Sequence, residues 1–302
     1  MRALNSQGLR RSAAVLWLLA SPPLAAQFVD KLEDTRTEAW AMRWFTAVAT
    51  PTAFGVAEGG EPWSFDLAFE GGWIPSLSED ERRVGFNGTK VEDINRVSVF
   101  GRPVVRLALP GELSVAAGWV PPVDIDGVKP NLVSLALARP LWTGERARVG
   151  AQLFYLTGEI NGDISCPANE VAAGDDPIAN PFGCEEVSDD TMSIDSFGVE
   201  LGVAWRAGEA VELFVSALWQ QLDAEFQVRA LYDGFRDRTL LVHDGDDVAA
   251  TAGLAWTMSD KLRFVGELYY SPLDVVRDPA GRGPSENDAL LNARVLASYR
   301  LR

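Results

Sequence analysis

The sequence predicts an all-β fold, an up-and-down antiparallel transmembrane β-barrel of about ten strands with a short N-terminal α-helix. Three observations support this prediction. Short runs of residues alternate between apolar and polar side chains, and the last such run is 291–301. Tight turns and long polar loops alternate strictly between the runs. Tryptophan and tyrosine residues stand at the ends of the runs, where the two interfaces of a membrane would lie.

The first 26 residues have the pattern of a secretory signal peptide. Arg2, Arg10 and Arg11 give a positive start, residues 13–20 form a short apolar run, and residues 24–26 offer small side chains before cleavage. No apolar run in the chain reaches the roughly 20 residues that a spanning helix needs. We therefore expect export from the cytoplasm. No lipid anchor is expected, because no cysteine stands at the cleavage position.

Residues 27–60 are predicted to form an N-terminal helix and a linker. Within residues 28–46 the apolar side chains fall roughly on one stripe, with charged side chains elsewhere. The pairs Thr50-Pro51 and Gly59-Gly60 end this region. Two roles are open for the helix: it plugs or covers the barrel on the periplasmic side, or it packs against the barrel for stability alone.

Residues 61–302 are predicted to form the barrel. The expected strands are 63–73, 96–109, 113–119, 133–141, 148–155, 197–206, 211–220, 248–256, 262–270 and 291–301. Pro103 suggests a bulge or bend in the second strand. Residues 221–247 continue the alternation past a bilayer, which predicts a long hairpin with its tip at Asp233-Gly234.

Loop lengths predict the topology. The turns near residues 111, 144, 208 and 259 are short, whereas the loops near 74–94, 120–130, 160–195, 222–247 and 272–288 are long. Ten strands with both termini on the short-turn side fit this order, and bacterial barrels have an even number of strands. On the last strand, Val295 is expected to face lipid and Ser298 the barrel interior.

These features resemble those of bacterial outer-membrane β-barrel proteins, across the signal peptide and nearly all of residues 63–302. The resemblance is one of architecture, with no specific family matched. It implies residence in the outer membrane, contact with outer-membrane lipid and insertion by the barrel assembly machinery. The chain departs from the usual aromatic C-terminal residue, because it ends in Leu301-Arg302. A secreted soluble β-protein with the same alternation is the alternative.

The composition narrows the classes of partner. The net charge of −16 becomes about −19 once the three signal arginines are removed, and nucleic-acid binding needs a basic surface. We therefore expect no nucleic-acid partner. No cofactor is expected either, and the sequence does not identify a small-molecule ligand.

The side chains expected to face the lumen are rich in charge. The set consists of Asp66, Glu70, Arg96, Arg102, Arg106, Arg148, Glu200, Arg206, Glu212, Arg263, Glu267, Arg294 and Arg300. It forms either an ion-pair network that fills a narrow barrel or a positive lumen that favours anions. The first interpretation is favoured, because barrels of eight strands are filled by side chains and open channels appear at about sixteen.

The cysteines and the acidic loops suggest further sites. Cys166 and Cys184 lie in one polar segment, where an exported protein favours a disulfide over a metal site. The loop 159–195 carries ten acidic residues and no basic ones, which favours a solvated loop. Calcium binding is the weaker alternative. Its candidates in two other loops are Asp124, Asp126, Asp244 and Asp246.

His243 is the only histidine, and Asp244 follows it. Outer-membrane proteases of ten strands use a His–Asp pair at the outer rim, so a protease-like hydrolase is one alternative function. The chain has no Gly-x-Ser-x-Gly elbow and no Gly-rich phosphate loop to support an enzyme. The favoured function is non-enzymatic: a narrow or gated porin-like pore or transporter, or a structural surface protein.

Overall fold

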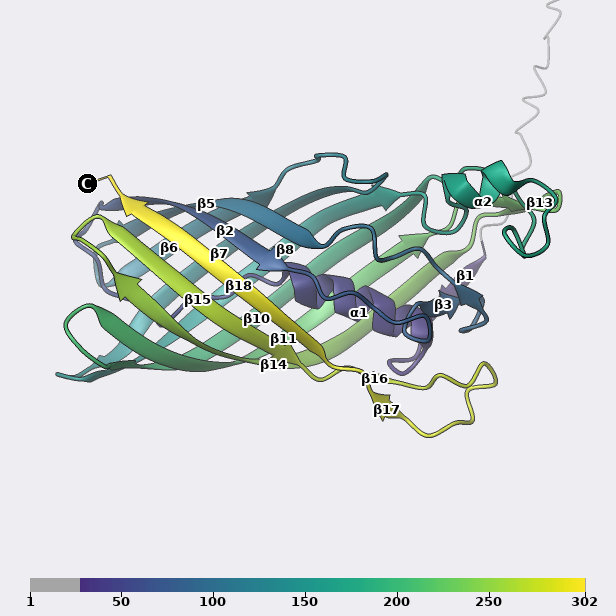
Figure 1. The fold of residues 1–302 in the computed structure, drawn as a ribbon. Helices are drawn as coiled ribbons and strands as arrows, with labels where there is room; N and C mark the ends of the chain where they lie inside the picture. The colour runs from purple at the N-terminus through teal and green to yellow at the C-terminus, as the bar shows by residue number, and fades with distance from the viewer. Residues whose placement is uncertain (1–27, 302) are drawn as a thin grey trace, which may run out of the picture.

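A computed structural model describes residues 28–301, in which ten strands close an antiparallel barrel (Figure 1). The barrel strands are β2 (Phe65–Trp73), β5 (Val99–Leu109), β6 (Leu113–Val120), β7 (Lys129–Thr143), β8 (Ala147–Gly162), β10 (Asp190–Arg206), β11 (Val211–Gln227), β14 (Leu240–Thr257), β15 (Leu262–Ser271) and β18 (Leu290–Arg300). Each pairs with the next along the chain, and β18 pairs with β2 to close the ring. The predicted fold class is confirmed. The predicted signal peptide lies outside the described residues.

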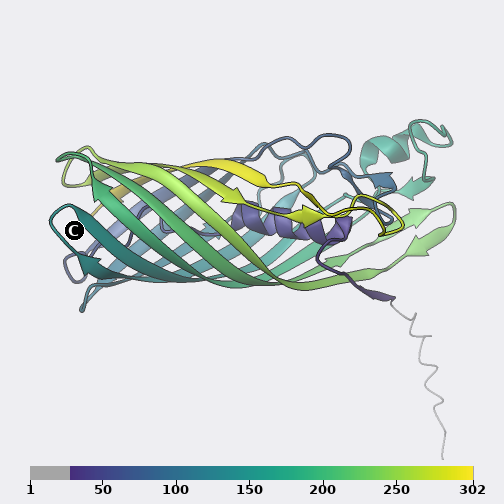
Figure 2. The ribbon, with the colours of Figure 1, turned by 90° about the horizontal axis from the view of Figure 1, so that it is seen from below.

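Smaller elements gather at the long-loop end of the barrel (Figures 1 and 2). They are β1 (Val29–Lys31), β3 (Arg83–Gly85), β4 (Lys90–Val91), α2 (Ala168–Ala173), β9 (Cys184–Glu186), β12 (Ala230–Tyr232), β13 (Phe235–Asp237), β16 (Asp274–Val275) and β17 (Glu286–Asn287). The predicted hairpin projects here, with Asp233-Gly234 between β12 and β13. Strand β9 pairs with β12, so the cysteine loop and this hairpin form one sheet above the rim.

Of the predicted bulge or bend at Pro103, the bulge is wrong and the bend stays a prediction. Pro103 pairs with Phe69 in a continuous register between β5 and β2. Strand β6 pairs with β5 only from Val104 onward, so the β5 edge that faces β6 is free at Pro103 and the missing N–H removes no ladder bond there. An irregularity lies instead in β7, between Pro140 and Trp142.

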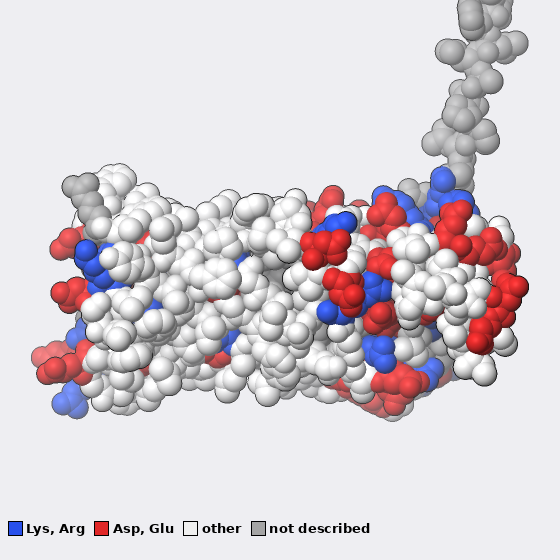
Figure 3. All heavy atoms as spheres, turned by 45° about the horizontal axis from the view of Figure 1, so that its top comes forward, with Lys and Arg blue, Asp and Glu red and all other residues white. Residues whose placement is uncertain are grey.

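The barrel exterior is an apolar band. On the face shown in Figure 3, charged side chains gather at the two ends and the wide band between them is nearly free of charge. Large apolar side chains point outward from this band, among them Leu135, Leu201, Val215 and Val295. An apolar exterior around a polar interior reverses the pattern of a soluble barrel, so the alternative of a secreted soluble protein is wrong. Neither helix of the described residues is long and apolar enough to cross a membrane.

The N-terminal helix is shorter than predicted and begins later. Helix α1 (Thr37–Ala49) is preceded by β1, which pairs in parallel with residues 240–242 of β14. Strand β15 pairs with β14 only from Ala250 onward, so the outer part of β14 offers β1 a free edge. The helix ends before Thr50-Pro51, because a residue that precedes proline disfavours helical geometry.

The N-terminal segment threads the barrel. It enters at the long-loop end, runs inside the barrel as α1, and reaches β2 at the short-turn end, near the C-terminus (Figures 1 and 2). All residues of α1 except Phe45 are buried. Long loops mark the outer end of such barrels. The ten-strand barrel begins with β2 and ends with β18 at the short-turn end, as predicted. The residues before α1 lie at the outer end, so α1 fills the lumen from the outer mouth and the prediction that it covers the periplasmic side is wrong.

Candidate functional site

Two arginines of the barrel wall hold the C-terminal end of α1. The last carbonyls of a helix have no partner within the helix, and α1 has no basic residue in its own last turn. Arg294 of β18 donates to the carbonyl oxygens of Ala47 and Thr50, each at 2.7 Å. Arg102 of β5 donates to the carbonyl oxygen of Ala49 at 3.0 Å. Cations also favour the negative end of the helix dipole, so the wall caps the plug.

Both arginines are themselves compensated in the barrel wall. Arg102 pairs with Glu70 of β2 at 2.6 Å, with side chains 1% and 2% exposed. Arg294 donates to Asn292 at 3.0 Å, and its guanidinium lies 4.1 Å from the ring centre of Tyr269. A buried charge without such partners would be costly. The capping groups are therefore held in place by contacts within the barrel wall as well as by the helix.

The chain that follows α1 is bound to polar side chains of the lumen wall. Three contacts share this form: Thr50 Oγ1 with Gln220 Oε1 at 3.0 Å, Thr52 Oγ1 with Glu267 Oε1 at 2.8 Å, and the Ala53 amide with Glu200 Oε2 at 2.8 Å. Since the acceptors lie on β10, β11 and β15, three different strands anchor the segment.

An ion-pair cluster lies at the inner end of the lumen. Glu58 of the threaded segment lies 3.0 Å from Arg148 and 3.3 Å from Arg263. Glu212 faces the same two arginines, at 2.7 Å and 3.8 Å. The carboxylate of the segment thus joins three side chains of the wall.

Two glycines make room for the threaded segment. A Cβ atom at Gly150 would lie 2.6 Å from Val56 Cγ1, and one at Gly202 would lie 2.9 Å from Val56 Cγ2. Val56 is buried between these glycines of β8 and β10. Close approach of this kind requires residues without a side chain, so the wall is shaped to the segment.

The middle of α1 is tied to β14. Arg43 lies 2.6 Å from Asp247, and both side chains are nearly buried. Arg43 also donates to the carbonyl oxygen of Asp34 at 3.2 Å. Arg43, Asp247, Glu58 and the two glycines were not singled out from the sequence. A lone arginine in an apolar helix was the one available signal, and it does not name its partner.

The predicted lumen set divides into three groups. Eight members line the lumen around the threaded segment: Glu70, Arg102, Arg148, Glu200, Glu212, Arg263, Glu267 and Arg294. Arg106 is half-buried at the inner end, close to Arg263. Three members reach the inner rim: Arg300 pairs with Asp66 at 3.1 Å, and Arg206 is exposed and donates to the Glu145 carbonyl oxygen at 3.3 Å.

Arg96 is wrongly placed in the predicted set. It precedes β5, whose first residue is Val99, and so it belongs to an outer loop rather than to the lumen wall. There it pairs with Asp93 at 3.1 Å and with Asp163. The alternation of the strand does not continue into this loop, which is why the pattern misassigned the residue.

His243 and Asp244 do not come together. They are neighbours on β14 and point to opposite faces, as successive strand residues do. His243 is 0% exposed, and burial lowers its pKa. Asp244 is exposed and lies 2.9 Å from Lys31, whose hydrogen bond holds the pKa of that carboxyl below its usual range.

The loop predictions have separate outcomes. Cys166 and Cys184 form the predicted disulfide. Asp124 lies 3.2 Å from Lys129 and accepts a hydrogen bond from the Gly127 amide. Within residues 28–301, no three histidine, cysteine or acidic side chains converge as a metal site would need. Calcium binding by Asp124, Asp126, Asp244 and Asp246 stays a prediction.

No protein-family model matches the chain, and no curated protein matches it either. The chain is similar to several solved structures. The protease OmpT of Escherichia coli is 8% identical, with a TM-score of 0.40, over 79% of this chain and 92% of that one. Ail, the attachment invasion locus protein of Yersinia pestis, is 13% identical with a TM-score of 0.33. That match covers 80% of this chain and all of Ail. The toluene transporter TodX of Pseudomonas putida is 11% identical, with a TM-score of 0.33, over 91% of this chain and 78% of TodX.

The barrel's own geometry defines its class. A closed antiparallel ring with an even number of strands, an apolar outer band, short turns at one end and long loops at the other is the form in which chains cross the bacterial outer membrane. The chain is an outer-membrane β-barrel protein, as the sequence predicted.

Proposed function

We propose that the protein is a non-enzymatic, gated outer-membrane pore, closed at rest by its own residues 28–62. The observation that carries the proposal is the capping of α1 by Arg102 and Arg294, which fixes a helix across the lumen through hydrogen bonds to its carbonyl oxygens. A ten-strand barrel is narrow, so one helix is enough to close it.

The polar character of the plug contacts favours a gate over a permanent filler. Well-packed apolar residues often stabilise a buried site as well as ion pairs do, or better. This lumen instead presents carboxylates, guanidinium groups and amides to the plug. Some of their atoms, Glu70 Oε1, Gln220 Nε2 and Glu267 Oε2, have no hydrogen-bond partner in the described part of the chain. Such a wall can be hydrated once the plug moves.

Conductance in a planar bilayer tests this proposal. We expect the wild-type barrel to be silent for most of the recording. Arg294→Gln removes charged donors that hold the Ala47 and Thr50 carbonyl oxygens, so it should raise the open probability at least tenfold. Arg300→Gln is the matched control, because Arg300 pairs with Asp66 at the inner rim.

The outcomes of this test are distinct. A barrel that conducts steadily in the wild type would contradict the closed state. An Arg294→Gln barrel that inserts, keeps its heat-dependent shift in gel mobility and stays as silent as Arg300→Gln would contradict the gate and leave a structural plug. Insertion by the barrel assembly machinery stays a prediction.

A further inference from the structure

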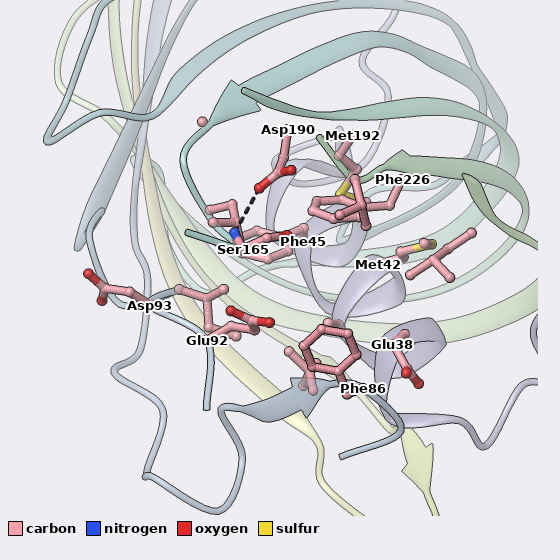
Figure 4. A pocket seen from close by; sticks show the side chains of 18 of the residues that line it. Glu38, Met42, Phe45, Phe86, Glu92, Asp93, Ser165, Asp190, Met192 and Phe226 are labelled. Carbon is pink, nitrogen blue, oxygen red and sulfur yellow. Dashed lines mark hydrogen bonds between the residues drawn. The ribbon is translucent and has the colours of Figure 1, made fainter. Parts of the chain in front are cut away.

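A cavity of about 400 Å³ lies at the outer mouth of the barrel, directly over α1. Figure 4 shows Met42 and Phe45 of α1 on one side of it, Met192 and Phe226 from β10 and β11 on another, and Phe86 from the loop 74–98 across from them. Ligand pockets have volumes of roughly 300–1,000 Å³ and mostly apolar walls, and protein interiors contain few voids larger than a water molecule. A cavity of this size and lining is therefore a candidate binding site.

The acidic groups around the cavity already have protein partners. Asp190 accepts hydrogen bonds from the amides of Ser165, drawn in Figure 4, and Arg229, at 2.7 Å and 2.8 Å. Glu38 accepts from the Asn87 amide at 2.7 Å. Because these carboxylates are engaged within the protein, a ligand needs no charge to satisfy them.

The loop over the cavity is fixed to the opposite wall. Lys90 is 1% exposed, pairs with Glu92 at 2.6 Å and donates to the Ser165 carbonyl oxygen at 2.8 Å. The ring of Phe86 stacks on that of Phe182, with 5.5 Å between centroids. The disulfide between Cys166 and Cys184 closes the loop that carries Phe182. The loop over the cavity is thus held by an ion pair, a hydrogen bond, a ring stack and a disulfide.

The charged residues around the cavity favour neutral apolar ligands over anionic ones. Its acidic residues are Asp30, Glu38, Glu92, Asp93, Asp190 and Asp237, and its basic residues are Arg36 and Arg96. An anionic head group would meet this acidic excess, and like charges repel at short range. The lining therefore fits a neutral molecule and disfavours one that carries a carboxylate or a sulfonate.

We infer that this cavity binds a compact, neutral, apolar molecule of the class of aromatic or short aliphatic hydrocarbons. The inference goes beyond the proposed gate, because the cavity is formed with the plug in place, with Met42 and Phe45 of α1 in its wall, and binding does not require the plug to move. Binding would bury the ligand against Met42, Phe45 and Phe226, and burial of apolar surface would supply the affinity.

Two fluorescent probes of one scaffold test the inference. N-phenyl-1-naphthylamine is neutral, and 1-anilinonaphthalene-8-sulfonate adds a sulfonate to the same framework. With the barrel in lipid nanodiscs and empty nanodiscs as the blank, we expect saturable binding of the neutral probe and at least tenfold weaker binding of the sulfonate. Absence of saturable binding above the blank, or equal binding of both probes, would overturn the inference.

Cavity-filling variants test whether the probe binds in this cavity. Val128→Trp and Val97→Trp put a large ring into the lining, so each should weaken binding of the neutral probe at least tenfold. Val123→Trp makes the same change in the same loop as Val128, at an exposed position outside the lining, and should bind like the wild type. Wild-type affinity in folded Val128→Trp and Val97→Trp barrels would overturn the assignment. Conductance is a separate readout, so a silent Arg294→Gln barrel would leave this site intact.

Discussion

Protonation of His243 makes the stability of the outer end of β14 depend on pH. Its side chain is buried on the part of the strand that extends beyond β15, where Asp34, Arg43 and Asp247 face it. Burial lowers its pKa from the ordinary value of 6.5, Asp34 and Asp247 oppose that shift, and Arg43 adds to it. The unfolded chain thus binds a proton at a higher pH than the folded chain does. The resulting contribution to stability is present above pH 6.5 and is lost as the pH falls through the lowered pKa.

We expect acid to loosen the pairing of β1 with β14. The reporters are the amides of Leu32 and Leu240, which donate to Val242 and Phe28 carbonyl oxygens at 2.8 Å. Their hydrogen-exchange protection factors should fall between pH 7.5 and pH 5 in the wild type. His243→Gln cannot take up the proton and should show a smaller fall. An equal fall in both proteins would assign the effect to other groups.

Gly150 tests how closely the wall fits the plug. A Cβ at this position would approach Val56 to 2.6 Å, and overpacking of this kind costs about 1–3 kcal/mol. Gly150→Ala should therefore lower the free energy of unfolding by about that amount. Gly266→Ala is the control, because its Cβ meets nothing within 4 Å. Equal urea midpoints for the two variants would contradict the close seating of Val56.

At the scale of an element, β18 separates a lipid face from a lumen face. Val295 is 62% exposed on the outside of the barrel and lies midway along the strand, whereas Ser298 is half-buried and donates to a carbonyl oxygen at 3.4 Å. Lysine near the bilayer midplane costs about 2–4 kcal/mol. Val295→Lys should lower the free energy of unfolding in lipid by that amount, and Ser298→Lys by less. The reverse order would contradict the assigned faces.

The strands could be predicted because lipid on one face and the lumen on the other select apolar and polar residues at alternate positions within each strand. The run 211–220 shows an apolar residue at every second position, and it forms the membrane part of β11. The outer ends of β8 and β10 were less predictable, because these strands continue into the outer loops where no lipid enforces the pattern. Arg96 was misplaced for the same reason.

The site that holds the plug was only partly predictable, because the sequence shows that a charged residue faces the lumen but not which group it contacts there. Arg102 and Arg294 were correctly expected to point inward, and Glu70 was expected to neutralise charge there. Arg102 and Arg294 also donate to the carbonyl oxygens of α1 and of the residue that follows it. These contacts could not be predicted, because they depend on where a helix distant in sequence enters the barrel. The apolar stripe within residues 28–46 predicts a helix but gives no direction of entry.

At the scale of the whole molecule, the path of residues 28–62 constrains assembly. The ring closes when β18 pairs with β2, and the threaded segment lies inside that ring, bound to β5, β10, β11, β14, β15 and β18. Its contacts therefore come from strands on most sides of the lumen. A barrel that closed first would have to admit a helix through an opening that its own side chains narrow, so the strands are expected to close around the segment.

This path places the described N-terminal residues outside the cell. Phe28 is 67% exposed, and its carbonyl oxygen accepts a hydrogen bond from the Leu240 amide at the outer end of β14. Gly208 lies in a short turn at the opposite end. A membrane-impermeant maleimide should label Phe28→Cys on intact cells as well as it labels Ile178→Cys, a position 90% exposed in the cysteine loop. Gly208→Cys should react only after the outer membrane is permeabilised. Only a segment that crosses the lumen can present residue 28 at the cell surface and still join β2 at the inner rim. If Phe28→Cys reacted only after permeabilisation while Ile178→Cys reacted on intact cells, the assigned direction of threading would be contradicted.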